Sequence, residues 1–169
     1  LNANGLWSKI DPNPKDDGKN IRASIIQYDV FAITETRLNA EQRDNIDQRT
    51  PNGYKLAAVE SRTANDGGGV AIYVKDCWKF EFVRKFSYKL NDRGGPVDDA
   101  GGDHPCQFVH IVIKQYQPDT TSEPIDLRDT HIVAVYLPPC PATKQERNLL
   151  DLLGNQLRNF PNVVVLGDI

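Results

Sequence analysis

The order of the apolar runs constrains the fold of this chain more than any other feature. Runs rich in β-branched and aliphatic residues are typical of strands, and an unbroken run such as Val163–Leu166 is typical of a strand buried on both faces. The predicted strands lie within residues 29–38, 54–61, 68–75, 106–116, 128–139 and 163–166. The predicted order is strand, helix, strand, several hairpin-linked strands, helix and strand. This order is typical of a mixed α/β layered sandwich. It fits neither an alternating βα barrel nor an all-β sandwich.

Two segments early in the chain carry helix signals. Ile21, Ile25 and Tyr28 are spaced by four and three residues, as on the apolar face of a short helix. Residues 39–47 are polar enough for a short exposed helix, for which Asn39 is the predicted N-cap. The chain therefore alternates between helix and strand only near its beginning.

The turns and the last helix complete the predicted order. Asn65–Gly67 is typical hairpin chemistry between the second and third of these strands. Residues 85–105 contain the stretch NDRGGPVDDAGGDHP, whose composition predicts a long loop. Thr143 and Glu146 form a capping box, which predicts a helix over residues 143–159 with a wide apolar face.

Composition limits the class of protein. The 169 residues suit one domain, and 39% hydrophobic with 25% charged residues is ordinary for a folded domain. A net charge of −3 argues against binding nucleic acid through a broad basic surface, while a local basic groove stays compatible. No apolar run approaches the roughly 20 residues of a membrane-spanning helix, so no membrane is expected among the partners. Cys77, Cys106 and Cys140 are odd in number and lack zinc-site spacing, which favours a reduced, intracellular setting.

Both ends of the chain are unusual for domain ends. Leu1 opens what reads as the end of a strand before a turn at Gly5, the chain has no Met, and Ile169 follows directly on an apolar strand. Buried strands of this kind lie inside sheets rather than at domain boundaries. We therefore expect residues 1–169 to be one partial domain that is truncated at both ends.

Four polar residues stand at the carboxyl ends of predicted strands: Asn2, Glu35, Tyr136 and Asp168. Strand ends collect ligand-binding groups in α/β sheets, because the strands hold these groups rigidly at an edge that faces solvent. Each residue alone has an ordinary explanation: a cap or turn for the two carboxylates, packing for Tyr136 and a turn for Asn2. The four together predict a single site.

Five short sequence motifs, in this order, resemble those of a known family: LNANGL, AITETRL, GGGVAIYVK, VAVYLPP and VVVLGD. They resemble the endonuclease/exonuclease/phosphatase superfamily and, more narrowly, the apurinic-endonuclease-like domain of non-LTR retrotransposon polyproteins. The resemblance implies a four-layer α/β/β/α sandwich of the DNase I-like type, incomplete at the C-terminus. It covers the whole chain but ends near the middle of the family's domain.

The resemblance also implies a reaction, the hydrolysis of a phosphodiester in target DNA. In the family's pattern Glu35 holds Mg²⁺, with Mn²⁺ as an alternative, and Asp168 orients or deprotonates the attacking water. Tyr136 contacts the scissile phosphate, and Asn2 helps to orient the metal-binding carboxylate or the phosphate. A hard cation on carboxylate oxygen suits this chemistry because it neutralises charge on the phosphate. A nuclear location and a downstream reverse transcriptase domain are implied as well.

The isolated chain is expected to be nearly inactive, because the family's later Asp and its closing Ser-Asp-His fall outside it. His104, His110 and His131 do not replace that His, since the last two lie inside predicted strands and the first in a Gly/Asp loop. Gly67–Gly69 precedes a strand and lacks a following Lys, so it predicts a hairpin rather than a phosphate cradle. Two alternatives stay open: a phosphoesterase acting on a small phosphoester or phospholipid, and a non-catalytic nucleic-acid-binding remnant.

Overall fold

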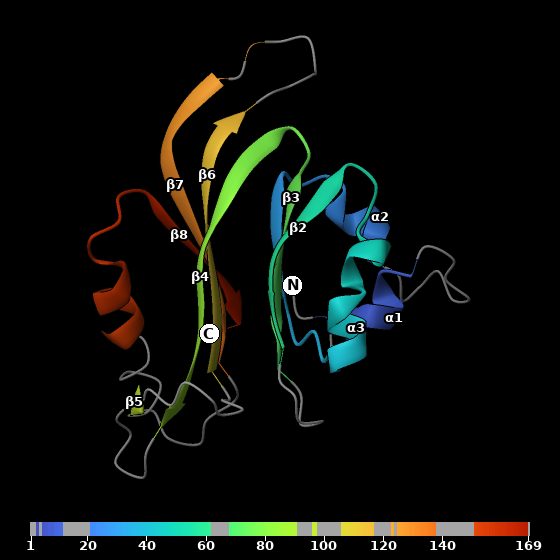
Figure 1. Ribbon diagram of the computed structural model, residues 1–169, viewed down its shortest axis with the longest axis horizontal. Coiled ribbons are helices and arrows are strands. Elements are labelled where there is room, and N and C mark those ends of the chain that lie inside the picture. Colours follow the sequence, from blue (N-terminus) through green and yellow to red (C-terminus); the bar gives the residue numbers. More distant parts are fainter. Residues whose placement is uncertain are drawn as a thin grey trace.

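Two β-sheets lie face to face in the computed structural model of the protein (Figure 1). The structure describes residues 3, 5–11, 21–61, 68–90, 96–97, 106–116, 123, 125–137 and 151–168. The first sheet has the order β1-β3-β2, from β1 (Val30–Thr34), β2 (Tyr54–Glu60) and β3 (Val70–Lys75). The second has the order β5-β4-β6-β7-β8, from β4 (Trp78–Leu90), β5 (Pro96–Val97), β6 (Cys106–Tyr116), β7 (Ile125–Tyr136) and β8 (Val163–Asp168).

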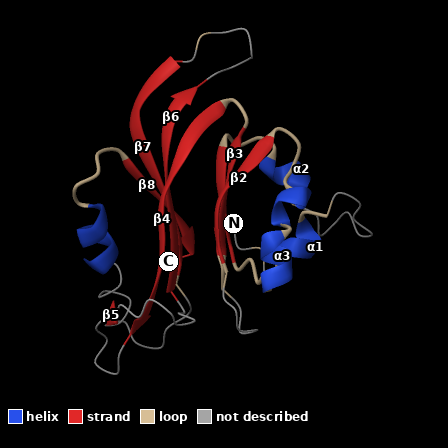
Figure 2. Ribbon diagram, in the orientation of Figure 1, coloured by secondary structure: helices blue, strands red, loops and turns tan. Residues whose placement is uncertain are grey.

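Helices cover the outer face of each sheet (Figure 2). Residues 151–157 form the helix outside the second sheet. In the sequence this helix comes between β7 and β8, which pair in parallel. Parallel strands that pair require such a crossover connection. The first sheet is covered by α1 (Leu6–Lys9), α2 (Arg22–Ile25), α3 (Ala40–Asp44) and the 3₁₀-helix η2 (Ile46–Arg49). The four layers confirm the predicted α/β/β/α sandwich.

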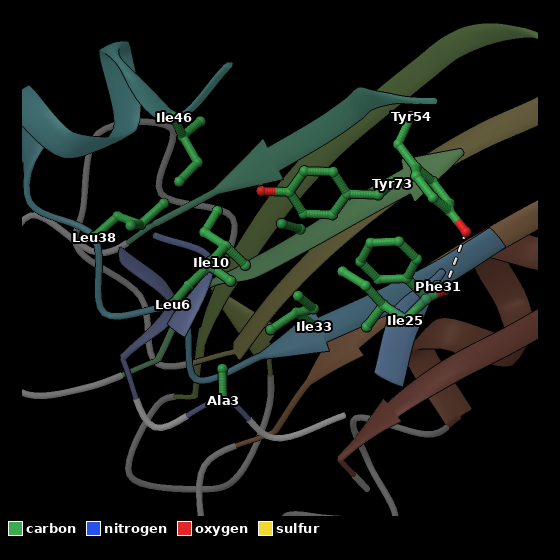
Figure 3. Packing of buried hydrophobic residues seen from close by; sticks show 11 residues of the cluster. Ala3, Leu6, Ile10, Ile25, Phe31, Ile33, Leu38, Ile46, Tyr54 and Tyr73 are labelled. Atoms are coloured by element: carbon green, nitrogen blue, oxygen red, sulfur yellow. Dashed lines mark hydrogen bonds between the residues drawn. The ribbon is translucent and has the colours of Figure 1, made fainter. Parts of the chain in front are cut away.

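Three apolar clusters hold the layers together. The middle cluster joins the two sheets and includes Val70 and Ile72 of β3 and Val109 and Ile111 of β6, all fully buried. A second cluster lies between the first sheet and its helices, where Phe31 stacks on Tyr73 with ring centroids 5.0 Å apart (Figure 3). The third packs Leu153 and Leu157 of the last helix on the second sheet. Because β3 is the central strand of a covered sheet, its residues are buried on both faces.

Much of the predicted order is confirmed. The antiparallel pair of β2 and β3, the pair of β6 and β7, and the final strand all form. β7 begins at Ile125, before the predicted range of 128–139, and β8 extends beyond Leu166 to Asp168. Asn39 caps α3 in a reciprocal capping box with Gln42. The start of the last helix at Thr143 and the turn at 62–67 lie outside the described residues. In the part of the chain that the structure describes, no helix is long and apolar enough to cross a membrane.

The main error concerns β4, because its second half falls in the segment that was predicted as a loop from residue 85. β4 pairs with β6 along its length, and Trp78, Phe80 and Phe82 alternate with Lys79 and Glu81. This alternation is a strand signal. Two register shifts interrupt the pairing, and such irregularities blur the period-two pattern.

The chain turns at Gly5 into α1, as predicted, and the strand end that was predicted before Gly5 lies mostly outside the described residues. Two smaller expectations were wrong. Tyr28 is 53% exposed rather than on a buried helix face. β8 is not buried on both faces, since Val164 and Val165 are 43% and 38% exposed. β8 is the edge strand of the described sheet, which leaves its outer side without a neighbour.

Candidate active site

A hydrogen bond between the two sheets marks the candidate site. Glu35 follows the last residue of β1, and Tyr136 is the last residue of β7. The Tyr136 hydroxyl donates to Oε1 of Glu35 at 2.5 Å. Glu35 is 9% exposed and Tyr136 is 4% exposed. The carboxyl ends of two strands that are about a hundred residues apart in the sequence therefore meet at one end of the sandwich.

Asp168 is placed at the same end by strand pairing. In the parallel ladder of β7 and β8 its Cα lies opposite that of Tyr136, although its side chain is outside the described part of the structure. Asn2 is outside that part too. Its neighbour Ala3 donates its backbone N–H to the Thr34 carbonyl at 2.9 Å, at the end of β1. The structure brings Glu35 and Tyr136 into contact and leaves the roles of Asp168 and Asn2 as predictions.

The backbone around Glu35 is held from both sides. Its φ is 58° and that of Arg37 is 49°, a left-handed conformation that residues other than Gly rarely adopt. Gly5 donates its N–H to the Glu35 carbonyl at 2.8 Å, and Arg37 donates its N–H to the Gly68 carbonyl at 2.9 Å. Such conformations persist where the surroundings over-determine them, and they cluster at functional sites. These bonds hold the Glu35 side chain toward the second sheet.

Arg37 balances the charge of the buried carboxylate. Its Nε donates to Oε2 of Glu35 at 2.8 Å, while its side chain stays 50% exposed. Burial raises the pKa of the Glu35 carboxyl, but the hydrogen bonds from Tyr136 and Arg37 and the charge of Arg37 outweigh burial. The pKa of Glu35 therefore lies below its usual value, and the side chain is a carboxylate at neutral pH.

A second polar bond between the sheets escaped the sequence analysis. Oε1 of Gln107, in β6, accepts the backbone N–H of Gly69 at 2.5 Å. Gln107 lies directly opposite Tyr136 in the antiparallel ladder of β6 and β7. The signal was a buried polar residue near the start of an otherwise apolar strand. Gly69 directly precedes β3, so the glycine run leads into a strand rather than a helix, as predicted.

His110 and His131 lie apart from this site, as expected. His110 and His131 are buried on the outer face of the second sheet, where Nε2 of His110 and Nδ1 of His131 are 2.9 Å apart. Both rings pack on Phe160. These contacts support the prediction that the two residues are packed and hydrogen-bonded, while His104 lies outside the described residues.

Comparison with known proteins identifies the family. A family model described as Endonuclease/Exonuclease/phosphatase family matches residues 1–168. The chain belongs to the endonuclease/exonuclease/phosphatase family. Members of this family are hydrolases that act on phosphoester bonds. The comparison with curated proteins found no match.

Solved structures share the fold at low sequence identity. An endonuclease/exonuclease/phosphatase family protein from Bacteroides thetaiotaomicron is 17% identical, with a TM-score of 0.53, and the similarity covers 97% of this chain and 60% of that one. An AP endonuclease from Leishmania major is 17% identical, with a TM-score of 0.55, over 99% and 53% of the two chains. A mannosyl-6-phosphatase from Bacteroides thetaiotaomicron gives 17% and 0.52, over 88% and 52%. The chain thus spans between half and three fifths of the length of these structures.

The endonuclease/exonuclease/phosphatase family is generally dependent on a divalent metal, and Glu35 fits the role of a ligand. Mg²⁺ prefers oxygen ligands, and one or two protein carboxylates with several waters often suffice. The described residues contain no cluster of three His, Cys, Asp or Glu side chains. They do contain one ionised carboxylate at the end of the sandwich where β1 and β7 end, oriented by Tyr136 and Arg37. A metal bound there through one protein carboxylate is compatible with this arrangement.

Proposed function

We propose that this chain carries the metal-binding half of a Mg²⁺-dependent DNA endonuclease, of the type that nicks target DNA for a non-LTR retrotransposon. One observation carries the proposal: Tyr136 donates to the Glu35 carboxylate from the opposite sheet, at the end where Asp168 pairs beside Tyr136. The likeness to an AP endonuclease supports the fold of such an enzyme. The sequence motifs around these residues, rather than the fold, favour the non-LTR retrotransposon branch of the superfamily.

In this proposal each residue has a separate task. Glu35 holds the cation, Mg²⁺ or in its place Mn²⁺, which when bound neutralises charge on the phosphate and polarises its oxygen. Tyr136 donates its one hydroxyl proton to the carboxylate before a cation binds, and once the carboxylate binds a cation the hydroxyl can donate to the phosphate instead. Asp168 takes the proton of the attacking water, and Asn2 orients the carboxylate or the phosphate. These are positioning and charge-stabilising roles, which typically contribute a few kcal/mol each.

The half-exposed Arg37 fits this chemistry as well. It neutralises Glu35 when no cation is bound, and its exposed guanidinium can turn to an anion once a cation takes over that task. The partners that follow from the proposal are DNA as substrate and a reverse transcriptase domain downstream in the same polyprotein. The proposed site of action is the nucleus, where the target DNA lies.

Nicking of supercoiled plasmid tests the proposal. The polypeptide in its longest natural form is compared with Glu35→Gln and Asp168→Asn variants, each with Mg²⁺ or with EDTA. Glu41→Gln, an exposed carboxylate on α3, is the matched control. We expect nicking only with metal, its loss in the first two variants and its retention in the control.

Nicking that persists in Glu35→Gln would contradict the proposed metal ligand. Absence of nicking together with release of phosphate from a small phosphomonoester would move the function to the phosphatase alternative. Neither activity in a folded protein that still binds DNA would favour the non-catalytic remnant.

A further inference from the structure

Two short hydrogen bonds cross between the sheets at the candidate site. One is the bond from Tyr136 to Glu35, and the other is the bond from the Gly69 N–H to Gln107. Gln107 and Tyr136 are directly opposed across β6 and β7, so the two bonds leave the second sheet from neighbouring positions. Gln107 is only 2% exposed, although its neighbours on the same face of β6 are apolar core residues. Buried polar side chains in such places normally satisfy a specific partner.

The partner of Gln107 belongs to a backbone segment that touches Glu35. The N–H of Gly68 donates to the Glu35 carboxylate. The N–H of Thr36 donates to the Gly69 carbonyl at 3.3 Å. Gly68 and Gly69 have φ values of 91° and 95°, which suit glycine. The segment therefore reaches the carboxylate with one N–H and reaches Gln107 with the next.

Close approach is a requirement of this segment. A Cβ on Gly69 would lie 1.9 Å from Oγ1 of Thr36 and 3.3 Å from the Glu60 carbonyl oxygen. The segment thus fits between Thr36 on one side and Gln107 on the other. Movement of the Gly69 amide would carry the Gly68 N–H away from Glu35, since the two amides are consecutive in the chain.

We propose that Gln107 is a positioning residue of the candidate active site, which fixes the Gly68–Gly69 segment so that the Gly68 N–H stays on the Glu35 carboxylate. The inference rests on the proposed function for its catalytic meaning and on the hydrogen bonds for its geometry. Glu35 is then oriented by donors from three directions: the hydroxyl of Tyr136, the guanidinium of Arg37 and the amide of Gly68. Partners of this kind, which orient a metal ligand, strongly affect metal affinity.

The chemistry of the side chain suits this task. An amide oxygen accepts the Gly69 N–H without adding charge, whereas a carboxylate at position 107 would repel the nearby carboxylate of Glu35. An apolar side chain of the same length would leave the Gly69 N–H buried without an acceptor. A neutral acceptor of the length of Gln therefore meets both conditions.

The test compares Gln107→Met with Val109→Ala. Met keeps the length of the side chain and removes the acceptor, and Val109 is a fully buried neighbour on the same face of β6. Both variants lose stability, but only Gln107→Met is expected to change the site. We expect amide hydrogen exchange at Gly68 and Gly69 to rise at least about tenfold beyond the change in Val109→Ala. We also expect Mn²⁺ affinity, measured by water proton relaxation, to fall about tenfold.

A folded Gln107→Met protein with Gly68 exchange equal to that of Val109→Ala would overturn the inference. If Gln107→Met does not fold, the test is made on the unaltered protein. NMR then measures the scalar coupling across the hydrogen bond, between the Gly69 nitrogen and the Gln107 side-chain carbonyl carbon. A measurable coupling with slow Gly69 exchange supports the inference, and fast exchange without coupling overturns it. Failure of the proposed function is distinct, because it shows as absence of Mn²⁺ binding in the unaltered protein, whatever the exchange rates.

Discussion

Strands β6 and β7 carry two buried polar pairs that differ in the face of the sheet on which they lie and in their hydrogen-bond partners. Gln107 and Tyr136 lie at one end of the strands, on the face toward the first sheet, and each bonds to a group of that sheet. His110 and His131 lie further along, on the face toward the last helix, and bond to each other. The first pair joins the two sheets, whereas the hydrogen bond of the second pair joins two strands of the same sheet.

The electrostatics of the two pairs follow from these surroundings. The first pair serves a carboxylate whose charge is balanced by a half-exposed Arg37. In the second pair burial, with smaller contributions from His131 and Arg84, lowers the pKa of His110 to about 4. Burial also lowers the pKa of His131, against the opposing charge of Asp129. Nδ1 of His110 has no partner among the described residues, so a second proton there would find no acceptor. A buried polar pair therefore indicates a functional site only when it orients a charge at an open edge.

Removal of the Glu35 charge, next to the first pair, is expected to have the largest effect on activity. Glu35→Gln keeps the shape and an acceptor for Tyr136, so the free energy of unfolding should change by less than about 1 kcal/mol. Nicking should fall at least about a thousandfold, or about 4 kcal/mol of transition-state free energy, because the metal ligand is lost. Plasmid nicking and thermal melting measure the two effects. A parallel loss of stability and activity would mean that Glu35 is structural, like the histidines.

The glycine that serves the first pair should tolerate no side chain. Gly69→Ala combines a positive φ with a Cβ 1.9 Å from Oγ1 of Thr36, so we expect a loss of about 3 kcal/mol in unfolding free energy. Gly154→Ala is the matched control, because that glycine lies in the last helix with no atom within 4 Å of its added Cβ. There we expect a gain of about 0.5–1 kcal/mol. Urea denaturation of both variants checks the difference, and equal effects would contradict the close approach at Gly69.

The second pair should make stability depend on pH. The unfolded chain protonates His110 near pH 6.5, whereas the folded chain does so only near pH 4. Between these values the unfolded state binds more protons, so stability is lost as the pH falls from about 6.5 to 4. One such group contributes at most about 1.4 kcal/mol per pH unit. Urea midpoints at pH 7, 5.5 and 4.5 measure the slope, which His110→Leu should reduce. An unchanged slope in that variant would assign the pH dependence elsewhere.

Removal of the Tyr136 hydroxyl should reduce activity less than removal of the Glu35 charge does. Tyr136→Phe removes one donor to Glu35, which keeps its hydrogen bonds from Arg37 and Gly68, and the expected loss is about 1 kcal/mol. Nicking should fall more than stability does, by about tenfold or more, since the hydroxyl also positions the phosphate in the proposed site. Melting and nicking assays on one preparation compare the two. Full activity in this variant would remove Tyr136 from the proposed site.

The sequence predicted most of the layers because apolar periodicity is a local property. The buried runs that became β1, β3, β6 and β7 needed only their own pattern, and Asn39 needed only Gln42 three residues later to cap α3. The predictions for β4 and β8 failed because their patterns depend on strand pairing. The alternation of β4 is interrupted at Val83, where its pairing with β6 shifts, and β8 reads as a doubly buried strand although it is an edge strand in the described sheet.

Local sequence pattern places Glu35 and Tyr136 at strand ends, and the motifs around them indicate the family. The contact of the Tyr136 hydroxyl with the Glu35 carboxylate, and that of Gln107 with the Gly69 N–H, are visible only in the folded protein. The physical reason is that these bonds join residues from different sheets, 101 and 38 positions apart. No periodicity within one segment records which strand end faces which, because the packing of the two sheets sets that pairing.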